Sequence, residues 1–126
     1  MYEVYVAAMF EAAHRLKGEC FGPAARTHGH TYRLESVVRG EDLAEDGSLL
    51  DVGELRGTVE GVAALLHYRD LDEVPGLAGK NTTAEVVAGF CWDGISPSLR
   101  GRGLATLTVR VWESPQVYAA REGALG

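Results

Sequence analysis

Apolar and polar side chains alternate along residues 2–14, and this period of two constrains the fold more than any other feature of the sequence. Successive side chains of a strand point to opposite faces, so the alternation predicts a half-buried strand. The same period returns in residues 28–40 and 104–113, and residues 116–122 could form a short last strand. Residues 15–27 contain glycines and a proline, which favour a long loop.

Two segments between these strands have helical spacing instead. Asp51 with Glu54, and Thr82 with Glu85, are pairs typical of helix N-termini, and apolar residues recur every three or four positions behind each pair. Cys91 lies on the second apolar stripe, where we expect it in the core. The order strand, strand, helix, helix, strand, strand predicts an α+β fold, an antiparallel sheet with both helices on one face.

The composition excludes several classes of protein. The 126 residues suit one domain, residues 1–126, and 18 acidic against 12 basic side chains give a net charge of −6. Affinity for nucleic acid comes from clustered Lys and Arg, so we expect no nucleic-acid partner. No apolar run approaches the roughly 18 residues of a membrane span, and the first residues lack the pattern of a secretory signal. Two cysteines make no disulfide framework, which favours a cytoplasmic protein without a membrane partner.

Three of the four histidines gather around one predicted hairpin. His28 and His30 are two residues apart, so they share a face of their strand. His14 ends the preceding strand, and three imidazoles converge if the two strands are neighbours about 4.8 Å apart. Three neutral imidazoles suit Zn²⁺ and leave the fourth position open, as in catalytic zinc sites. The alternative is that they are surface or hydrogen-bonded histidines without a ligand.

Five segments together resemble the 6-pyruvoyl-tetrahydropterin synthase / 6-carboxy-tetrahydropterin synthase family, namely F-x-A-A-H at 10–14, H-G-H at 28–30, Asp51–Leu55, Asn81–Glu85 and Val109–Glu113. The resemblance implies the tunnelling fold, a four-stranded antiparallel sheet with two helices on one face. It also implies a homo-oligomer, a trimer or a dimer of trimers, whose sheets close into a β-barrel with active sites between subunits. The implied substrate is 7,8-dihydroneopterin triphosphate, in pterin or deazapurine synthesis.

The resemblance assigns roles to individual residues. The three histidines match the family's zinc ligands. Glu113 matches the family's pterin anchor, and a carboxylate can accept two parallel N–H bonds from the guanidine-like edge of a pterin. Thr82 and Thr83 match the segment that lines the pterin pocket. The alternatives are a solvated glutamate at a strand end and plain helix capping by the threonines.

The proton-transfer residues depart from the family. Its general base is a cysteine in the loop before H-G-H, assisted by an Asp-His pair. Here Cys20 lies further upstream than we expect, and His67 and Tyr68 occupy the Asp and His positions. Cys20 and His67 are candidate bases, and Tyr68 is a candidate acid through its phenol. The alternative is that His67 and Tyr68 only cap the first helix and shield the core.

The sequence therefore predicts a zinc-dependent carbon–oxygen lyase that acts on a small pterin-like molecule, with an altered product or an altered substrate side chain. One alternative is a non-catalytic paralogue that binds a pterin or a purine. Another is a structural oligomer with vestigial histidines, which predicts neither metal nor ligand.

Overall fold

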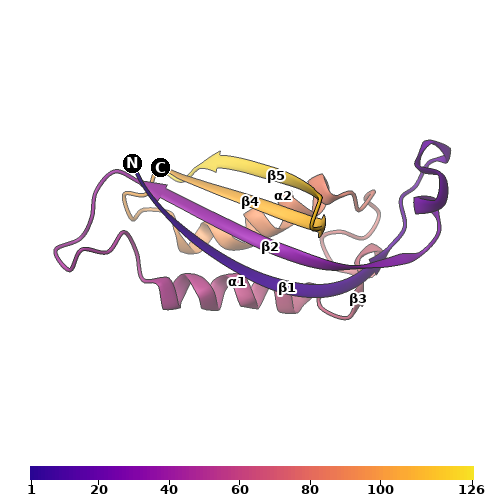
Figure 1. The fold of residues 1–126 in the computed structure, drawn as a ribbon, viewed down its shortest axis with the longest axis horizontal. Helices are drawn as coiled ribbons and strands as arrows, with labels where there is room; N and C mark the ends of the chain where they lie inside the picture. Colours follow the sequence, from indigo (N-terminus) through magenta and orange to yellow (C-terminus); the bar gives the residue numbers. More distant parts are fainter.

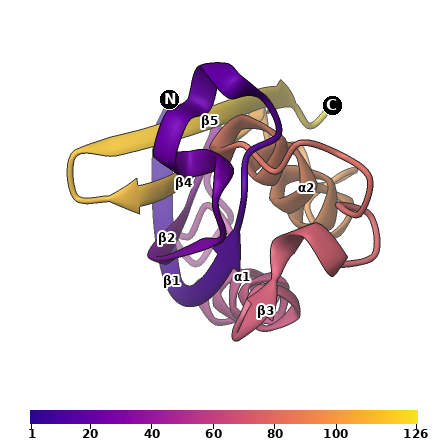
Figure 2. The same cartoon turned by 90° about the vertical axis from the view of Figure 1, so that its right-hand side faces the viewer.

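The computed structural model describes residues 1–126 as a sheet covered on one face by two helices (Figure 1, and turned by 90° in Figure 2). Its strands are β1 (Tyr2–His14), β2 (His28–Gly40), β3 (Arg69–Asp70), β4 (Thr106–Ser114) and β5 (Val117–Ala124). The α-helices are α1 (Val52–Leu66) and α2 (Ala84–Ile95), and the short 3₁₀ helices are η1 (Glu19–Ala25), η2 (Leu71–Glu73) and η3 (Ser96–Ser98). This arrangement confirms the α+β class.

The four long strands pair as the sequence predicts, because β1–β2, β2–β4 and β4–β5 are all antiparallel. The expected sheet of four antiparallel strands is nevertheless wrong in one respect. β3 adds a fifth strand at the edge, parallel to β1, with Ala12 opposite Arg69 and Ala13 opposite Asp70. Two residues are too few to show a period, so the pattern misses them. The chain leaving α1 thus runs beside the end of β1, next to His14.

The first helix begins as predicted and the second begins one residue later. Oδ1 of Asp51 accepts a hydrogen bond from the backbone N of Glu54 over 3.2 Å, which caps α1. The predicted cap of α2 by Thr82 is wrong, because the hydroxyl oxygen of Thr83 accepts from the backbone N of Val86 over 3.3 Å. The hydroxyl of Thr82 is engaged elsewhere. No helix combines the length and the apolar character that a membrane crossing requires.

The core lies between the sheet and the helices. The alternation along β1 and β2 buries Val6, Phe10, Leu34 and Val38 in a cluster of 25 residues that includes the inner faces of both α-helices. Cys91 is fully buried in it, as predicted. The opposite face of the sheet carries no helix (Figure 1). Because of this asymmetry, side chains on the helix-covered face of β1 and β2 point towards the covering segments.

Candidate metal centre

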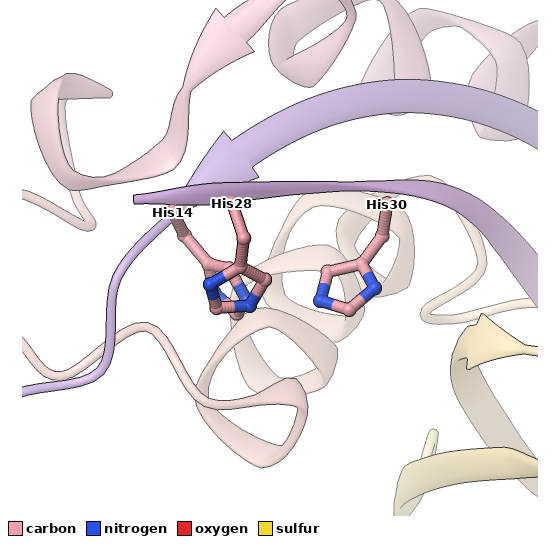
Figure 3. Close-up of side chains that lie close together, drawn as sticks. All are labelled: His14, His28 and His30. Carbon is pink, nitrogen blue, oxygen red and sulfur yellow. The ribbon is translucent and has the colours of Figure 1, made fainter. Parts of the chain in front are cut away.

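The three histidines lie together at one end of the β1–β2 hairpin. The register pairs His14 with His28, and His30 follows two residues later, so all three imidazoles are on the helix-covered face. Figure 3 shows the rings extending from the same side of the strands, with His14 and His28 overlapping in this view and His30 beside them. One ligating nitrogen of each lies within 4.8 Å of the others. The prediction that three imidazoles converge is confirmed.

Hydrogen bonds fix which ring nitrogen is available to a ligand. Nδ1 of His14 lies 2.8 Å from the carbonyl oxygen of Thr82, and Nδ1 of His28 lies 2.7 Å from the carbonyl oxygen of Arg26. A carbonyl oxygen only accepts, so each Nδ1 carries the hydrogen and each Nε2 keeps its lone pair in the neutral ring. This is the arrangement of metal-binding histidines, whose second nitrogen donates to a carbonyl or carboxylate.

Buried polar atoms without partners gather at the same place. Five buried side-chain nitrogen or oxygen atoms lack a hydrogen bond, and three of them are Nε2 of His14, Nε2 of His30 and the hydroxyl of Tyr32. Buried polar groups are nearly always hydrogen-bonded, so this gathering indicates a ligand site. Burial, reinforced by His14 and His28 and opposed by Glu113, lowers the pKa of His30 below 6.5. This shift favours the neutral ring, the form that a divalent ion such as Zn²⁺ binds.

Glu113 reaches the histidines from β4. Its Oε2 lies 3.3 Å from Nε2 of His30 and 3.9 Å from Nε2 of His14, although the shorter contact lacks hydrogen-bond geometry. The pairing of β4 with β5 shifts register between Trp112 and Ser114, at Glu113 itself. The predicted direction of Glu113, towards the buried face, is confirmed. Its carboxylate oxygen is a potential metal ligand beside the imidazoles. The strand pattern alone does not predict that it lies so close to them.

Tyr32 forms part of the wall behind the imidazoles, and the sequence motifs do not single it out. Its fully buried ring stacks on Phe10 at a centroid distance of 4.8 Å and lies edge-on to His30 at 5.2 Å. Burial raises the pKa of its hydroxyl, and the carboxylates of Glu113 and Asp72 raise it further, so this group is a hydrogen-bond donor. The signal that could identify it is its position two residues after His30, on the same face of the strand.

Thr82 contacts the site, whereas its neighbour Thr83 caps a helix. Thr82 is fully buried, its carbonyl faces His14, and its hydroxyl donates to Oδ1 of Asp72 over 2.9 Å. Thr83 is partly exposed and caps α2. Asp72 is a site residue that the sequence patterns miss. Its side-chain partners, Thr82 and the backbone of Arg15, lie 10 and 57 residues away, so no local motif marks it.

His67 and Tyr68 follow α1 and lie against the edge of β1. Nδ1 of His67 accepts a hydrogen bond from the backbone N of Glu11 over 3.1 Å, and the two aromatic rings are 3.8 Å apart between centroids. Tyr68 has a φ of 57°, a region that bulky side chains rarely adopt, and it is 77% exposed. With Glu11 it lines an open cleft of about 570 Å³ that extends to His30.

Cys20 is not joined to these groups. It is an exposed free thiol in η1, the excursion that projects beyond the ends of β1 and β2 in Figure 1. It lies outside the cluster of ligating atoms formed by the three histidines. The structure thus brings His67 and Tyr68 together, and it brings Glu113 and Thr82 to the imidazoles, while Cys20 stands apart.

Comparisons with known proteins agree with one another. A family model described as 6-pyruvoyl tetrahydropterin synthase matches residues 3–124. The 6-pyruvoyl tetrahydrobiopterin synthase of Dictyostelium discoideum is 31% identical over 103 residues, 73% of this chain and 76% of that protein. The dihydroneopterin monophosphate aldolase of Pyrococcus furiosus is 35% identical over 94 residues, 75% of each chain. The structure of Caenorhabditis elegans 6-pyruvoyl tetrahydropterin synthase has the same fold, with a TM-score of 0.83 and 24% identity over 98% of this chain and 96% of that one.

Proposed function

The chain belongs to the 6-pyruvoyl tetrahydropterin synthase family, and we propose that it is a zinc-dependent carbon–oxygen lyase acting on a dihydropterin such as 7,8-dihydroneopterin triphosphate. The observation that carries this proposal is the cluster of His14, His28 and His30, in which Nε2 of His14 and Nε2 of His30 are buried without a hydrogen-bond partner. The three Nε2 atoms would hold the ion and leave one position to the substrate. When bound, the ion supplies a Lewis acid for an oxygen of the substrate's side chain.

Glu113 is proposed to anchor the pterin ring. Its carboxylate can accept two parallel N–H bonds from the ring, and such charge-assisted pairs are strong. Its side chain is 24% exposed, so an entering ligand can reach it. In the structure Oε2 points towards His30 and His14. Rotation about the side-chain torsions of Glu113 would turn the carboxylate to the ring and free the space beside the imidazoles for the substrate's side chain.

Thr82 and Thr83 are proposed to line the pterin pocket, and their hydroxyls differ in whether they can donate a hydrogen bond to the ligand. A hydroxyl has one hydrogen to donate and two lone pairs. Thr83 uses a lone pair to cap α2, so its hydrogen remains available to a carbonyl or ring nitrogen of the ligand. Thr82 gives its hydrogen to Asp72, so towards a ligand it acts only as an acceptor.

Proton transfer is proposed to involve His67, Tyr68 and Cys20. Because Nδ1 of His67 accepts from the backbone N of Glu11, Nε2 carries the hydrogen in the neutral ring. In this state Nε2 of His67 donates a hydrogen bond but not a proton, so His67 acts as a base only when Nδ1 is released from Glu11. The exposed phenol of Tyr68 beside it is the candidate acid. Cys20 is the remaining candidate base, and its participation requires η1 to approach the imidazoles when substrate binds.

The expected homo-oligomer, a trimer or a dimer of trimers, also belongs to this proposal. The sheet face opposite the helices exposes large side chains, including Tyr5, Met9 and Tyr118. β5 leaves one edge of the sheet without a partner strand. Joining sheets of several copies would cover this face and remove the free edge, a feature that proteins otherwise have to protect.

Two alternatives have a specific observation in their favour. The relative from Pyrococcus furiosus is named an aldolase, and the altered residues at His67 and Tyr68 fit a changed reaction. An aldolase would cut the three-carbon side chain of the pterin and release a two-carbon aldehyde. The position of Cys20 outside the histidine cluster favours a non-catalytic paralogue that binds a pterin or a purine.

Mass spectrometry of the products separates these functions. The zinc-loaded protein is incubated with 7,8-dihydroneopterin triphosphate and, separately, with the monophosphate. Release of triphosphate with a rearranged side chain supports the lyase. Release of a phosphorylated two-carbon aldehyde contradicts the lyase and supports the aldolase. An unchanged pterin, together with binding that Glu113→Ala abolishes, supports the non-catalytic paralogue.

A further inference from the structure

The hydrogen bonds behind His14 connect it to one distant carboxylate. His14 is 1% exposed, and its Nδ1 donates to the carbonyl of Thr82 over 2.8 Å. Thr82 in turn donates through Oγ1 to Oδ1 of Asp72 over 2.9 Å. The other carboxylate oxygen of Asp72, Oδ2, accepts from the backbone N of Arg15 over 2.9 Å. Asp72 therefore joins the residue that orients the ring of His14 to the residue that follows His14 in the chain.

Asp72 is itself held in place, and no comparable support exists for the other two imidazoles. Its backbone N donates to Oδ1 of Asp70 over 3.0 Å, which fixes the start of η2. His28, by contrast, is oriented by the carbonyl of Arg26 in its own loop. His30 has Oε2 of Glu113 beside it, 3.3 Å from Nε2, and no carbonyl orients its ring. His14, the most buried of the three, is thus the one whose hydrogen-bond partner, Thr82, is held by a side chain from another part of the sequence.

From this geometry we propose that Asp72 is a positioning residue for the metal centre, which fixes the ring orientation and the tautomer of His14 through Thr82. The proposal rests on the metal site of the proposed function. Partners that orient a metal-binding histidine change metal affinity by about 10- to 100-fold when they are removed. Asp72 touches neither the imidazole nor the ion's position, so its removal alters affinity and coordination geometry while all three ligands remain.

Metal binding by variants of Asp72 tests this role. Zinc affinity is measured by competition with a chromogenic chelator, and coordination geometry by the visible absorption of bound Co²⁺. We expect Asp72→Ala to bind zinc about tenfold more weakly, the lower end of the range for a direct partner, and to change the Co²⁺ spectrum. Asp72→Asn should lose less zinc affinity, because its amide carbonyl oxygen can still accept from one of the two donors, Thr82 or the backbone N of Arg15. Asp46→Ala is the matched control, since Oδ1 of Asp46 accepts from the backbone N and hydroxyl of Ser48 away from the site.

Variants of Thr82 distinguish positioning from a general loss of stability. Thr82→Val removes the hydroxyl and should weaken zinc binding. Thr82→Ser keeps the hydroxyl and should have the Co²⁺ spectrum of the unaltered chain. Asp72→Ala and Thr82→Val both break the same hydrogen bond, from Thr82 to Asp72. The double variant should therefore lose no more zinc affinity than Asp72→Ala alone. Unaltered zinc affinity and Co²⁺ spectrum in Asp72→Asn and Thr82→Val overturn the proposal, even where Asp72→Ala fails to fold. An unaltered chain that binds neither ion refutes the metal site itself.

Discussion

Replacing Tyr32 by Phe should stabilise the protein, although most changes in a core destabilise it. The ring of Tyr32 is fully buried, and its hydroxyl has no hydrogen-bond partner. Leaving a buried donor unpaired costs about 1–3 kcal/mol. Phenylalanine keeps the ring stacked on Phe10 at 4.8 Å and removes only the unpaired group, while the small void left by the oxygen offsets part of the gain. We expect Tyr32→Phe to raise the free energy of unfolding of the metal-free protein by about 1 kcal/mol.

Urea unfolding in the presence of a chelator measures this change directly. In thermal unfolding a gain of about 1 kcal/mol raises Tm by about 3–5 °C for a chain of this length. Tyr2→Phe is the matched control, because Tyr2 is 51% exposed and its replacement should change stability by less than about 0.5 kcal/mol. Lower stability of Tyr32→Phe would refute the reasoning, since it would show that the hydroxyl is hydrogen-bonded in the folded protein, for example to a buried water.

Three further changes test other parts of the structure. Burial raises the pKa of the Cys91 thiol from 9.0 to about 12, so a thiol reagent at pH 8 should label only the exposed Cys20 in the folded protein, and both cysteines in urea. The unfolded chain releases the Cys91 proton near pH 9 and the folded chain does not, so the free energy of unfolding should fall as pH rises above about 9. Rapid labelling of both thiols without urea would contradict the burial of Cys91. Asp51→Ala removes the cap on the backbone N of Glu54 and should lower the free energy of unfolding by about 1 kcal/mol in urea, whereas Asp51→Asn should retain most of it. Glu113→Gln should weaken binding of a dihydropterin, measured by calorimetry, by about tenfold, because a charged acceptor is lost; an unchanged affinity would argue against the anchor.

The sheet could be predicted because a period of two specifies both the buried face of a strand and its length. The alternation of residues 2–14 and 28–40 places Phe10 and Leu34 in the core, as the structure shows. β3 could not be predicted, since its two residues are defined only by pairing with β1. The predicted start of α2 is wrong by one residue because either of two adjacent threonines fits a helix cap. The hydroxyl of Thr82 bonds to Asp72 instead, and Thr83 caps the helix.

The metal centre was predictable only where its residues share a strand or a pair of strands. H-G-H puts two imidazoles on one face, and the β1–β2 pairing brings His14 beside them. The support of His14 by Asp72 could not be predicted, because it depends on how η2 packs against the end of β1. The unpaired hydroxyl of Tyr32 likewise appears only when the surrounding side chains are in place. The catalytic roles of Cys20, His67 and Tyr68 stay predictions.

The zinc content of the purified protein tests the central claim most directly. Elemental analysis after saturation with Zn²⁺ and removal of free ion should find one zinc per chain, with none in His28→Ala. His67→Ala is the control, because its ring lies outside the cluster of ligating atoms, and it should keep the full zinc content. A saturated protein without zinc, or a His28→Ala variant that retains it, would contradict the assignment of the three imidazoles as the metal ligands.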